Sequence, residues 1–181
     1  THQLPTLESH EALMQLAARR ELELIAARRM SEVFSQHIKL QDLLEQALHI
    51  ALDVVNAENG SVLLADTDNR TLVFYHSIGQ QPVLPGTAVP WYEGIAGTVY
   101  RTGMPEIVPD AQTDYRHFKQ VDEATGAITH DMVTLPLKRW EGDPIGVIQV
   151  MNKRGGKFLD RDDMAILTII ASLAAVAIEH T

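Results

Sequence analysis

Apolar residues recur at helical spacing through the first third of the chain. Between Glu8 and about His37 there is no Gly or Pro, and Ala, Leu, Glu and Arg dominate, so we expect one long helix. Two stripes with alternating three- and four-residue spacing run through this region, first Leu13, Ala17, Arg20, Leu24, Ala27, Ser31, Phe34 and Ile38, and beside it Met30, Val33, His37, Leu40, Leu44, Ala47, Ala51 and Val54. Near-heptad stripes of this kind are typical of a helix that packs against another helix.

The partner of this long helix is either a second chain or the core of its own chain. No other domain is available to bury the stretch before residue 30, so the pattern favours a homodimer. A core helix packed within one chain is the alternative.

The middle of the chain alternates strand-like and helix-like segments, bounded by Gly, Pro, Asn and Asp. The expected order is a break at 39–42, a helix at 43–56 ended by Asn59-Gly60, a hairpin with strands at 61–65 and 71–77, a helix at 93–103, an edge strand at 105–108, a loop with a short helix at 110–126, and a strand at 131–139. The turn at 66–70 is made of residues that tolerate positive φ. Gly103 occupies the C′ position of the helix predicted at 93–103.

A strongly apolar, β-branched run occupies 144–153, and it predicts a strand buried on both faces in the middle of a sheet. Two glycines at 155–156 end it. Asp160 is then a suitable N-cap for the last helix, with Asp162 and Asp163 in the first turn, where carboxylates suit the positive end of the helix dipole.

The last predicted helix, 160–180, is apolar nearly all round. Only Thr168 and Ser172 are polar between Met164 and Ile178, so the helix must be covered on two sides, by the sheet and by the N-terminal helices, a partner chain, or both. No Gly or Pro stop signal follows it. We therefore expect the helix to continue into an output domain of a longer protein.

Composition narrows the classes of function. The 181 residues suffice for one domain and an extension, and 45% apolar residues suffice for a core. A net charge of −9 disfavours nucleic acid and anionic lipid. The chain has no cysteine, which excludes disulfides and thiol chemistry, and its longest apolar run is shorter than the roughly 18–20 residues that span a bilayer. We expect a cytoplasmic protein with no membrane insertion.

The polar residues form no sequence motif of catalysis or metal binding. The eight histidines are scattered without a His-Glu-x-x-His motif or a carboxylate–histidine cluster, so no metal ligand is assigned. There is no Gly-x-Ser-x-Gly elbow and no phosphate loop, so no catalytic residue is assigned and the protein is expected not to be an enzyme. A non-covalent haem or iron centre would need His76, His117 or His130 to face a pocket.

One spacing carries more than secondary structure. Asn152-Lys153, then Phe158, then Asp162-Asp163 resembles the Asn-Lys…Phe-x-x-x-Asp-Glu signature of cyclic-nucleotide-binding GAF domains, with Asp163 where that family usually has Glu. We interpret the signature as a structural tie, with Lys153 paired to Asp162 and Phe158 packed under the connection.

Two further motifs strengthen the resemblance, which covers about residues 40–180. Gly94-Ile95-Ala96-Gly97 is similar to the family's helix beside the pocket, and 122–129 resembles the Asp-x-x-Thr-Gly-x-x-Thr lid of phosphodiesterases and adenylyl cyclases. The resemblance implies an α+β fold: a central, mostly antiparallel β-sheet, with terminal helices on one face and short helices and loops over a ligand pocket on the other. Residues 1–38 would be a signalling and dimerisation helix, and 39–181 the GAF domain.

The resemblance also assigns a ligand site, made of Ser61, Ile95, Ala96, Phe118, Thr125, Thr129 and Gln149. Thr hydroxyls and backbone amides can donate to a cyclic phosphate, Phe118 can stack on a purine, and Gln149 can donate to and accept from a base edge. Gln149 replaces a Glu found in some family members, and Ser77-Ile78 stands where an aromatic-Asp pair can read the base, so the resemblance leaves the base open. Structural roles are the alternative: caps of turns for the threonines, core packing for Phe118 and bonds to the sheet backbone for Gln149.

Together these features imply a non-catalytic sensory module of a larger signal-transduction protein. Its expected ligand is a purine cyclic nucleotide, cAMP or cGMP, and its expected partners are a second copy of the chain and a covalently linked output domain. A ligand-free dimerisation module, or a sensor of a different small molecule, is the alternative.

Overall fold

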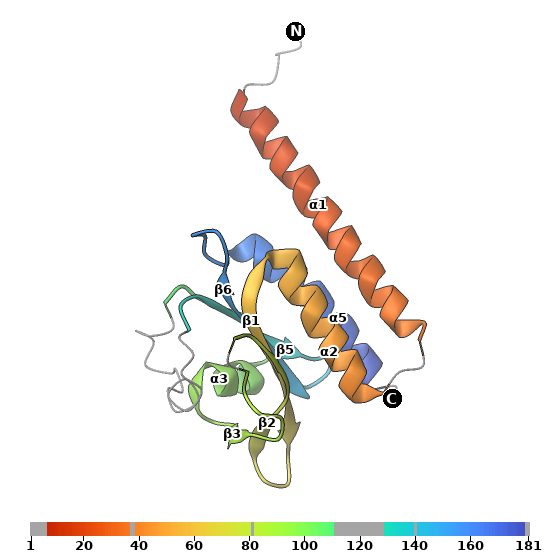
Figure 1. Ribbon diagram of the computed structural model, residues 1–181, viewed down its shortest axis with the longest axis vertical. Helices are drawn as coiled ribbons and strands as arrows, with labels where there is room; N and C mark the ends of the chain where they lie inside the picture. The colour runs from red at the N-terminus through yellow and green to blue at the C-terminus, as the bar shows by residue number, and fades with distance from the viewer. Residues whose placement is uncertain (1–6, 37–38, 81, 111–128, 140, 180–181) are drawn as a thin grey trace.

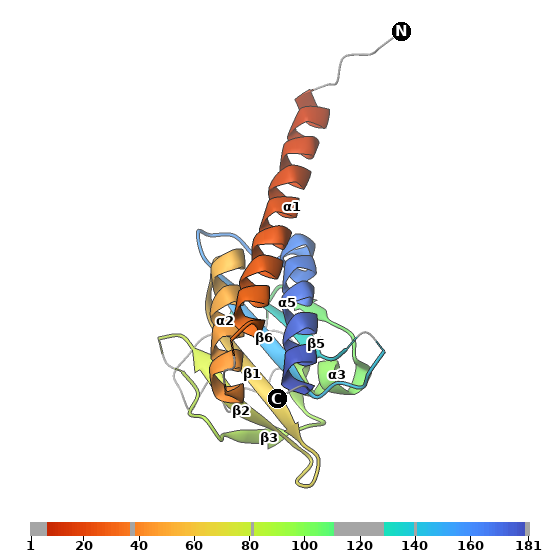
Figure 2. The ribbon, with the colours of Figure 1, turned by 90° about the vertical axis from the view of Figure 1, so that its right-hand side faces the viewer.

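The computed structural model describes residues 7–36, 39–80, 82–110, 129–139 and 141–179. In this part of the chain a six-stranded sheet separates a layer of three helices from a single shorter helix (Figures 1 and 2). The elements are α1 (Leu7–Phe34), α2 (Leu40–Val55), β1 (Ala57–Asp66), β2 (Thr71–Ile78), β3 (Ala88–Pro90), α3 (Gly94–Thr102), β4 (Glu106–Val108), β5 (Met132–Leu137), β6 (Gly146–Lys153) and α5 (Arg161–Glu179). The strand order is β3-β2-β1-β6-β5-β4, and every described pairing is antiparallel. The predicted α+β fold is confirmed.

The helix layer is built from α1, α2 and α5. Helices α2 and α5 lie on the sheet, and the C-terminal half of α1 packs across both (Figure 2). The second stripe forms this contact: its members Met30, Val33, Leu44, Ala47 and Ala51 are all buried. The stripe is therefore a core feature of one chain.

The N-terminal half of α1 extends beyond the body of the protein (Figure 1). Its stripe remains exposed, with Leu13 at 59% and Leu24 at 68% of their full accessible surface. Within this chain nothing in the described residues covers these side chains.

The last helix is covered on two sides, as expected. One side of α5 contacts β5, and its other contacts are with α1 and α2. Ile166, Ile170 and Ala174 are at most 2% exposed. None of the helices in the described ranges is both long and apolar enough to span a bilayer.

Strand β6 lies between β1 and β5, as the apolar run at 144–153 predicted. Val147, Ile148 and Val150 are at most 1% exposed, so both faces of the strand are buried. A Cβ on Gly146 would clash with the carbonyl oxygen of Leu63, so only glycine allows β6 to approach β1 this closely.

The second helix ends where it was predicted to end, but the residues expected to end it, Asn59-Gly60, do not do so. Helix α2 stops at its C-cap Asn56, which adopts the left-handed conformation (φ 55°, ψ 54°), and β1 begins at the next residue. Asn59 and Gly60 lie inside β1, opposite Met151 and Val150 of β6. A Cβ on Gly60 would be 2.8 Å from Leu48 Cδ1, so this glycine serves the close packing of α2 on the sheet rather than a turn.

The break predicted at 39–42 is wrong, because residues 40–42 already belong to α2, and β3 was not predicted. The remaining predicted elements are confirmed where the structure describes them. Strands β1 and β2 form the expected hairpin, α3 ends at Gly103 with φ 69°, and β4 is an edge strand. The loop and short helix expected at 110–126 fall almost wholly outside the described residues, as do His117, Phe118 and Thr125.

Candidate functional site

A row of polar side chains crosses the sheet on the face that α3 covers. Directly opposed residues of antiparallel strands point to the same face, so the strand register alone places these side chains together. The polar row consists of Ser77 on β2, Ser61 on β1, Gln149 on β6, Thr134 on β5 and Glu106 on β4, each the register partner of the next. The apolar side chains that flank the row, among them Leu63, Met132 and Val147, form one cluster with Ile95, Ala96 and Val99 of α3.

The centre of the polar row is buried and internally hydrogen-bonded. Ser61 Oγ donates to Ser77 Oγ at 3.2 Å, and Gln149 Nε2 lies 3.4 Å from its acceptor Thr134 Oγ1. Ser61 is 2% exposed, Thr134 is fully buried and Gln149 is 9% exposed. Polar groups in an apolar cluster have a desolvation cost, which these bonds offset only in part at such distances.

Of the residues assigned to a ligand, Ser61 and Gln149 are direct neighbours in this row. Thr129, which is 4% exposed, precedes β5, and its hydroxyl lies 3.8 Å from the sulfur of Met151, two residues beyond Gln149 on the same side of β6. The structure thus brings three of the assigned polar side chains to one face of the sheet.

Ile95 and Ala96 lie in the first turn of α3, with their side chains buried at 3% and 9% exposure. Backbone N–H groups in the first turn of a helix have no acceptor within the helix, so these two residues can offer amides to an anion. Phe118 and Thr125, the remaining assigned residues, lie outside the described part of the chain.

Lys153 and Asp163 form the ion pair that the signature suggested, but the predicted partner, Asp162, is wrong. Lys153 Nζ is 2.8 Å from both carboxylate oxygens of Asp163, whose side chain is 8% exposed. Asp162 instead faces Arg19 of α1 at 3.4 Å.

The cap of α5 explains this choice. Asp160 Oδ1 accepts from the N–H of Asp163 at 2.9 Å, and Asp163 Oδ2 accepts from the N–H of Asp160 at 3.0 Å. This reciprocal arrangement is a capping box, which turns Asp163 inward toward Lys153. Burial raises the pKa of the Asp163 carboxyl above its ordinary value, while the hydrogen bond from Lys153 acts in the opposite direction.

The expectation that Phe158 packs under this connection is also wrong. Phe158 is 66% exposed, and its neighbour Leu159 is buried at 3%. The N–H of Leu159 donates to Asp131 Oδ2 at 2.8 Å, and Asn152 Oδ1 accepts from the N–H of His130 at 2.8 Å. The signature is therefore a structural tie, as interpreted, that joins β6, the start of β5 and α5.

Sequence reasoning missed Thr134 and Glu106 of the polar row, and Asp131 of the tie. A single polar residue in an apolar strand carries no sign of its neighbour across the sheet, because the strand register is needed to align them. The Asp-x-x-Asp spacing of 160–163, by contrast, was a usable capping-box signal for Asp163.

Among the histidines considered for haem, neither described one faces the polar row. His76 pairs with Val62, which belongs to the core on the helix side of the sheet, and the side chain of His130 is exposed.

Comparison with known proteins identifies the family of this chain. A family model described as "GAF domain" matches residues 37–179, and the chain belongs to this family. GAF domains are sensory and regulatory modules.

The relatives include a dual 3',5'-cyclic-AMP and -GMP phosphodiesterase 11A of Takifugu rubripes, which is 31% identical over 81% of this chain, and a dual phosphodiesterase 11 of Drosophila melanogaster, which is 27% identical over 99% of it. The alignments span only 17% and 13% of those proteins. Among solved structures, the GAF domain from an Acinetobacter phosphoenolpyruvate-protein phosphotransferase superposes with a TM-score of 0.72 at 19% identity, covering 87% of this chain and 93% of that one.

Proposed function

We propose that this GAF domain is a non-catalytic sensor whose ligand is a purine cyclic nucleotide, cAMP or cGMP, bound on the sheet face that holds the polar row. The observation that carries the proposal is the convergence of Ser61, Gln149 and Thr129 beside the first turn of α3. The names of two relatives, which act on both cyclic nucleotides, support the ligand class.

Each part of the ligand has a matching group. The amides of Ile95 and Ala96, at the positive end of α3, suit the cyclic phosphate. Gln149 offers one donor and one acceptor to a base edge, and the hydroxyls of Ser61 and Thr129 suit a ribose or phosphate oxygen. Phe118 and Thr125 are expected to complete the cover.

The proposal includes a homodimer that forms through α1 and α5 and an output domain linked to the same chain. The exposed apolar side chains of α1, among them Met14 at 70%, support the dimer, and the small share of the relatives that the chain spans supports the larger protein. A cytoplasmic location follows from the intracellular ligand. A ligand-free dimerisation module is the second candidate, because the same α1 surface would serve it.

Thermal unfolding with added cyclic nucleotide tests the ligand. A ligand that binds only the folded state, at a hundredfold excess over its dissociation constant, should stabilise it by about 2.7 kcal/mol, which raises the melting temperature by about 5–11 °C for a domain of this size. If millimolar cAMP and cGMP both leave the melting temperature unchanged, the cyclic-nucleotide proposal is wrong. The domain is then a dimerisation module or a sensor of another ligand.

The variant Gln149→Leu locates the site. It removes the amide that is proposed to bind the base, so it should weaken binding by about tenfold, since one unmade hydrogen bond costs about 1.4 kcal/mol. Gln46→Leu makes the same chemical change on α2, in the helix layer, and should bind as the wild type does. Equal binding by both variants would show that Gln149 does not contact the ligand.

A further inference from the structure

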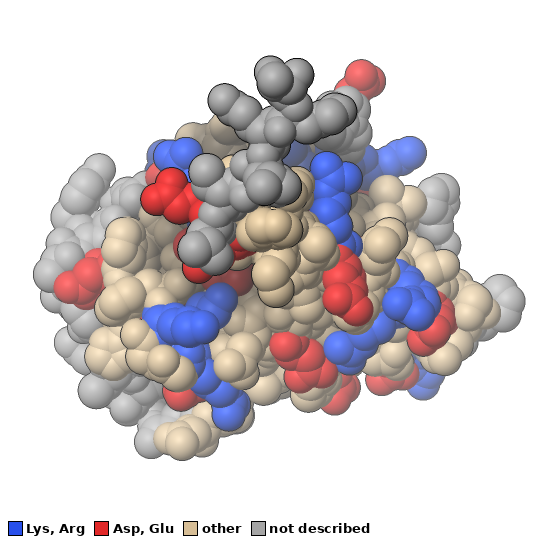
Figure 3. All heavy atoms as spheres, turned by 90° about the horizontal axis from the view of Figure 1, so that it is seen from above, with Lys and Arg blue, Asp and Glu red and all other residues tan. Residues whose placement is uncertain are grey.

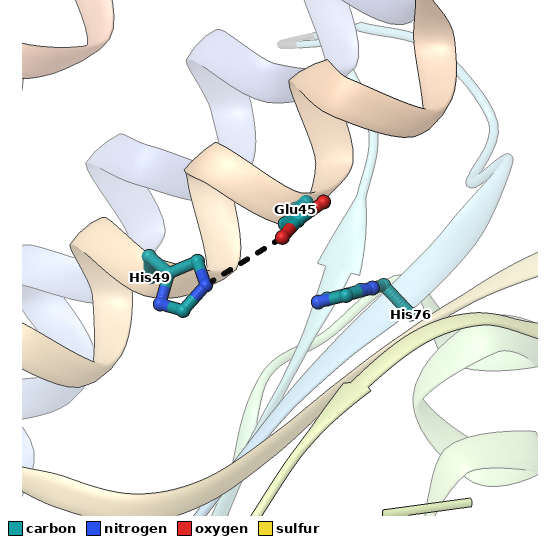
Figure 4. Close-up of side chains that lie close together, drawn as sticks. All are labelled: Glu45, His49 and His76. Atoms are coloured by element: carbon teal, nitrogen blue, oxygen red, sulfur yellow. Dashed lines mark ion pairs between the residues drawn. The ribbon is translucent and has the colours of Figure 1, made fainter. Parts of the chain in front are cut away.

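Glu45, His49 and His76 come together on the opposite side of the sheet from the polar row. Glu45 and His49 lie one helical turn apart on α2, and His76 lies on β2, so the fold unites residues from two elements (Figure 4). The sequence contains the Glu-x-x-x-His pair but gives no sign of its partner on β2. His76 is distant in the chain, so the sequence patterns did not reveal a cluster of three ligands.

The ligand atoms of these three side chains already lie close to one another. All of them are within 4.8 Å, and His49 Nε2 lies 3.9 Å from Glu45 Oε1. The ligands of a tetrahedral zinc ion stand roughly 3.3–3.5 Å apart, so shifts of about an ångström would complete the geometry. The side chains of Glu45 and His49 are about half-exposed and can make such shifts without disturbing the core.

We propose that Glu45, His49 and His76 form a binding site for a divalent first-row transition metal ion. Two imidazole nitrogens and one carboxylate oxygen suit Zn²⁺ and Ni²⁺ and exclude a site of the all-oxygen kind that Mg²⁺ and Ca²⁺ prefer. Water would complete the coordination, because the cluster is open to solvent on the side of α2.

The surroundings favour a cation. Within the described residues, no hydrogen bond or ion pair binds these three side chains except the contact of Glu45 with His49, so their lone pairs are not committed elsewhere. Asp42 lies one turn before Glu45 on α2 and is exposed, and the whole chain carries a net charge of −9. A bound ion would cross-link α2 to β2, whose next residue, Ser77, belongs to the polar row on the other face.

Titration of the intact chain with ZnCl₂, followed by calorimetry after removal of adventitious metal with a chelator, tests the proposal. We expect one saturable site per chain. Glu45→Gln, His49→Gln and His76→Gln should each weaken it by at least tenfold, because even loss of an outer-shell partner typically weakens metal sites by about 10–100-fold. Substitution with Co²⁺ gives a second readout, a visible absorption band that His49→Gln should change.

His10→Gln on the exposed part of α1 is the matched control and should bind zinc as the wild type does. Circular dichroism without metal checks that the variants fold. If His76→Gln does not fold, His49→Gln and Glu45→Gln decide, since both residues are about half-exposed. The proposal is overturned if millimolar zinc shows no saturable binding, or if the folded variants bind with wild-type affinity, which would assign the ion to histidines elsewhere.

Discussion

At the scale of single residues, the contrast between Asp162 and Asp163 shows how local geometry decides roles. Adjacent positions on a helix point about 100° apart, so one carboxylate meets Lys153 in the interior and the other meets Arg19 at the surface. The buried pair and the exposed pair therefore differ in energy although they share the same chemistry.

Lys153→Met should destabilise the fold by about 3–5 kcal/mol, because it leaves the buried Asp163 carboxylate without its cation. Arg19→Met breaks only the exposed contact with Asp162 and should cost at most about 1 kcal/mol. Denaturant unfolding of both variants measures the difference, and equal losses would contradict the structural role of Lys153.

The loss in Lys153→Met should also depend on pH. Because burial raises the pKa of Asp163 in the folded state, the protonated form is favoured there, and the contribution of this group to stability is present at low pH and lost as pH rises through the folded-state pKa. Without Lys153 the carboxyl stays neutral to higher pH. The variant should therefore lie closest to the wild type below the ordinary pKa of 3.8 and fall furthest behind at neutral pH.

At the scale of elements, α1 has two halves with different surroundings. Ala26 and Met30 are fully buried against the body of the protein, whereas the apolar side chains of the first half are exposed. Exposed leucines at near-heptad spacing are a suitable seam for a second copy of the same helix.

Leu24→Glu should therefore dissociate the proposed dimer without unfolding the chain, because Leu24 is 68% exposed. Gln15→Glu introduces the same charge at an exposed position on another side of α1 and should leave the dimer intact. Light scattering at micromolar concentration measures both. The proposed dimer is wrong if the wild-type protein is monomeric under these conditions. A Leu24→Glu variant that remains a dimer would show that the dimer forms through another surface.

At the scale of the whole molecule, the body and the exposed half of α1 differ in how they are packed. The body contains the main core, which joins α2, α5 and the sheet, while the first half of α1 adds little to it. On the face viewed down α1, acidic and basic side chains are interspersed (Figure 3), which suits a protein partner better than a polyanion.

Hydrogen exchange should resolve these two regions. Amides of β1, β6 and α5 should exchange slowly at any protein concentration, since they open only with global unfolding. Amides of residues 8–20 should be protected only at concentrations where the dimer forms, and dilution should release them. Concentration-independent protection of α1 would indicate that its first half is stable without a partner.

Local patterns by themselves determined most of the elements of this protein. The helical spacing from residue 8, the apolar run at 144–153, the hairpin turn at 66–70 and the cap at Asp160 all act through neighbours in sequence. The structure confirms each of them, although the first helix ends at Phe34 rather than near residue 37. Motif spacing also identified the family, because the Asn152…Asp163 signature lies within one short segment of the chain, where it joins β6 to the start of α5.

Tertiary structure decided what depends on register and packing. Only the pairing of β2, β1, β6, β5 and β4 aligns the polar row, and only the crossing of α2 over β2 brings His76 to Glu45 and His49. Asn59-Gly60 resembles a turn in sequence but lies inside β1. Gly60 is there because α2 packs closely on the strand at this point, which only the tertiary structure shows. These contacts join residues far apart in the chain, and their geometry arises when strands and helices pack rather than from the preferences of any short segment.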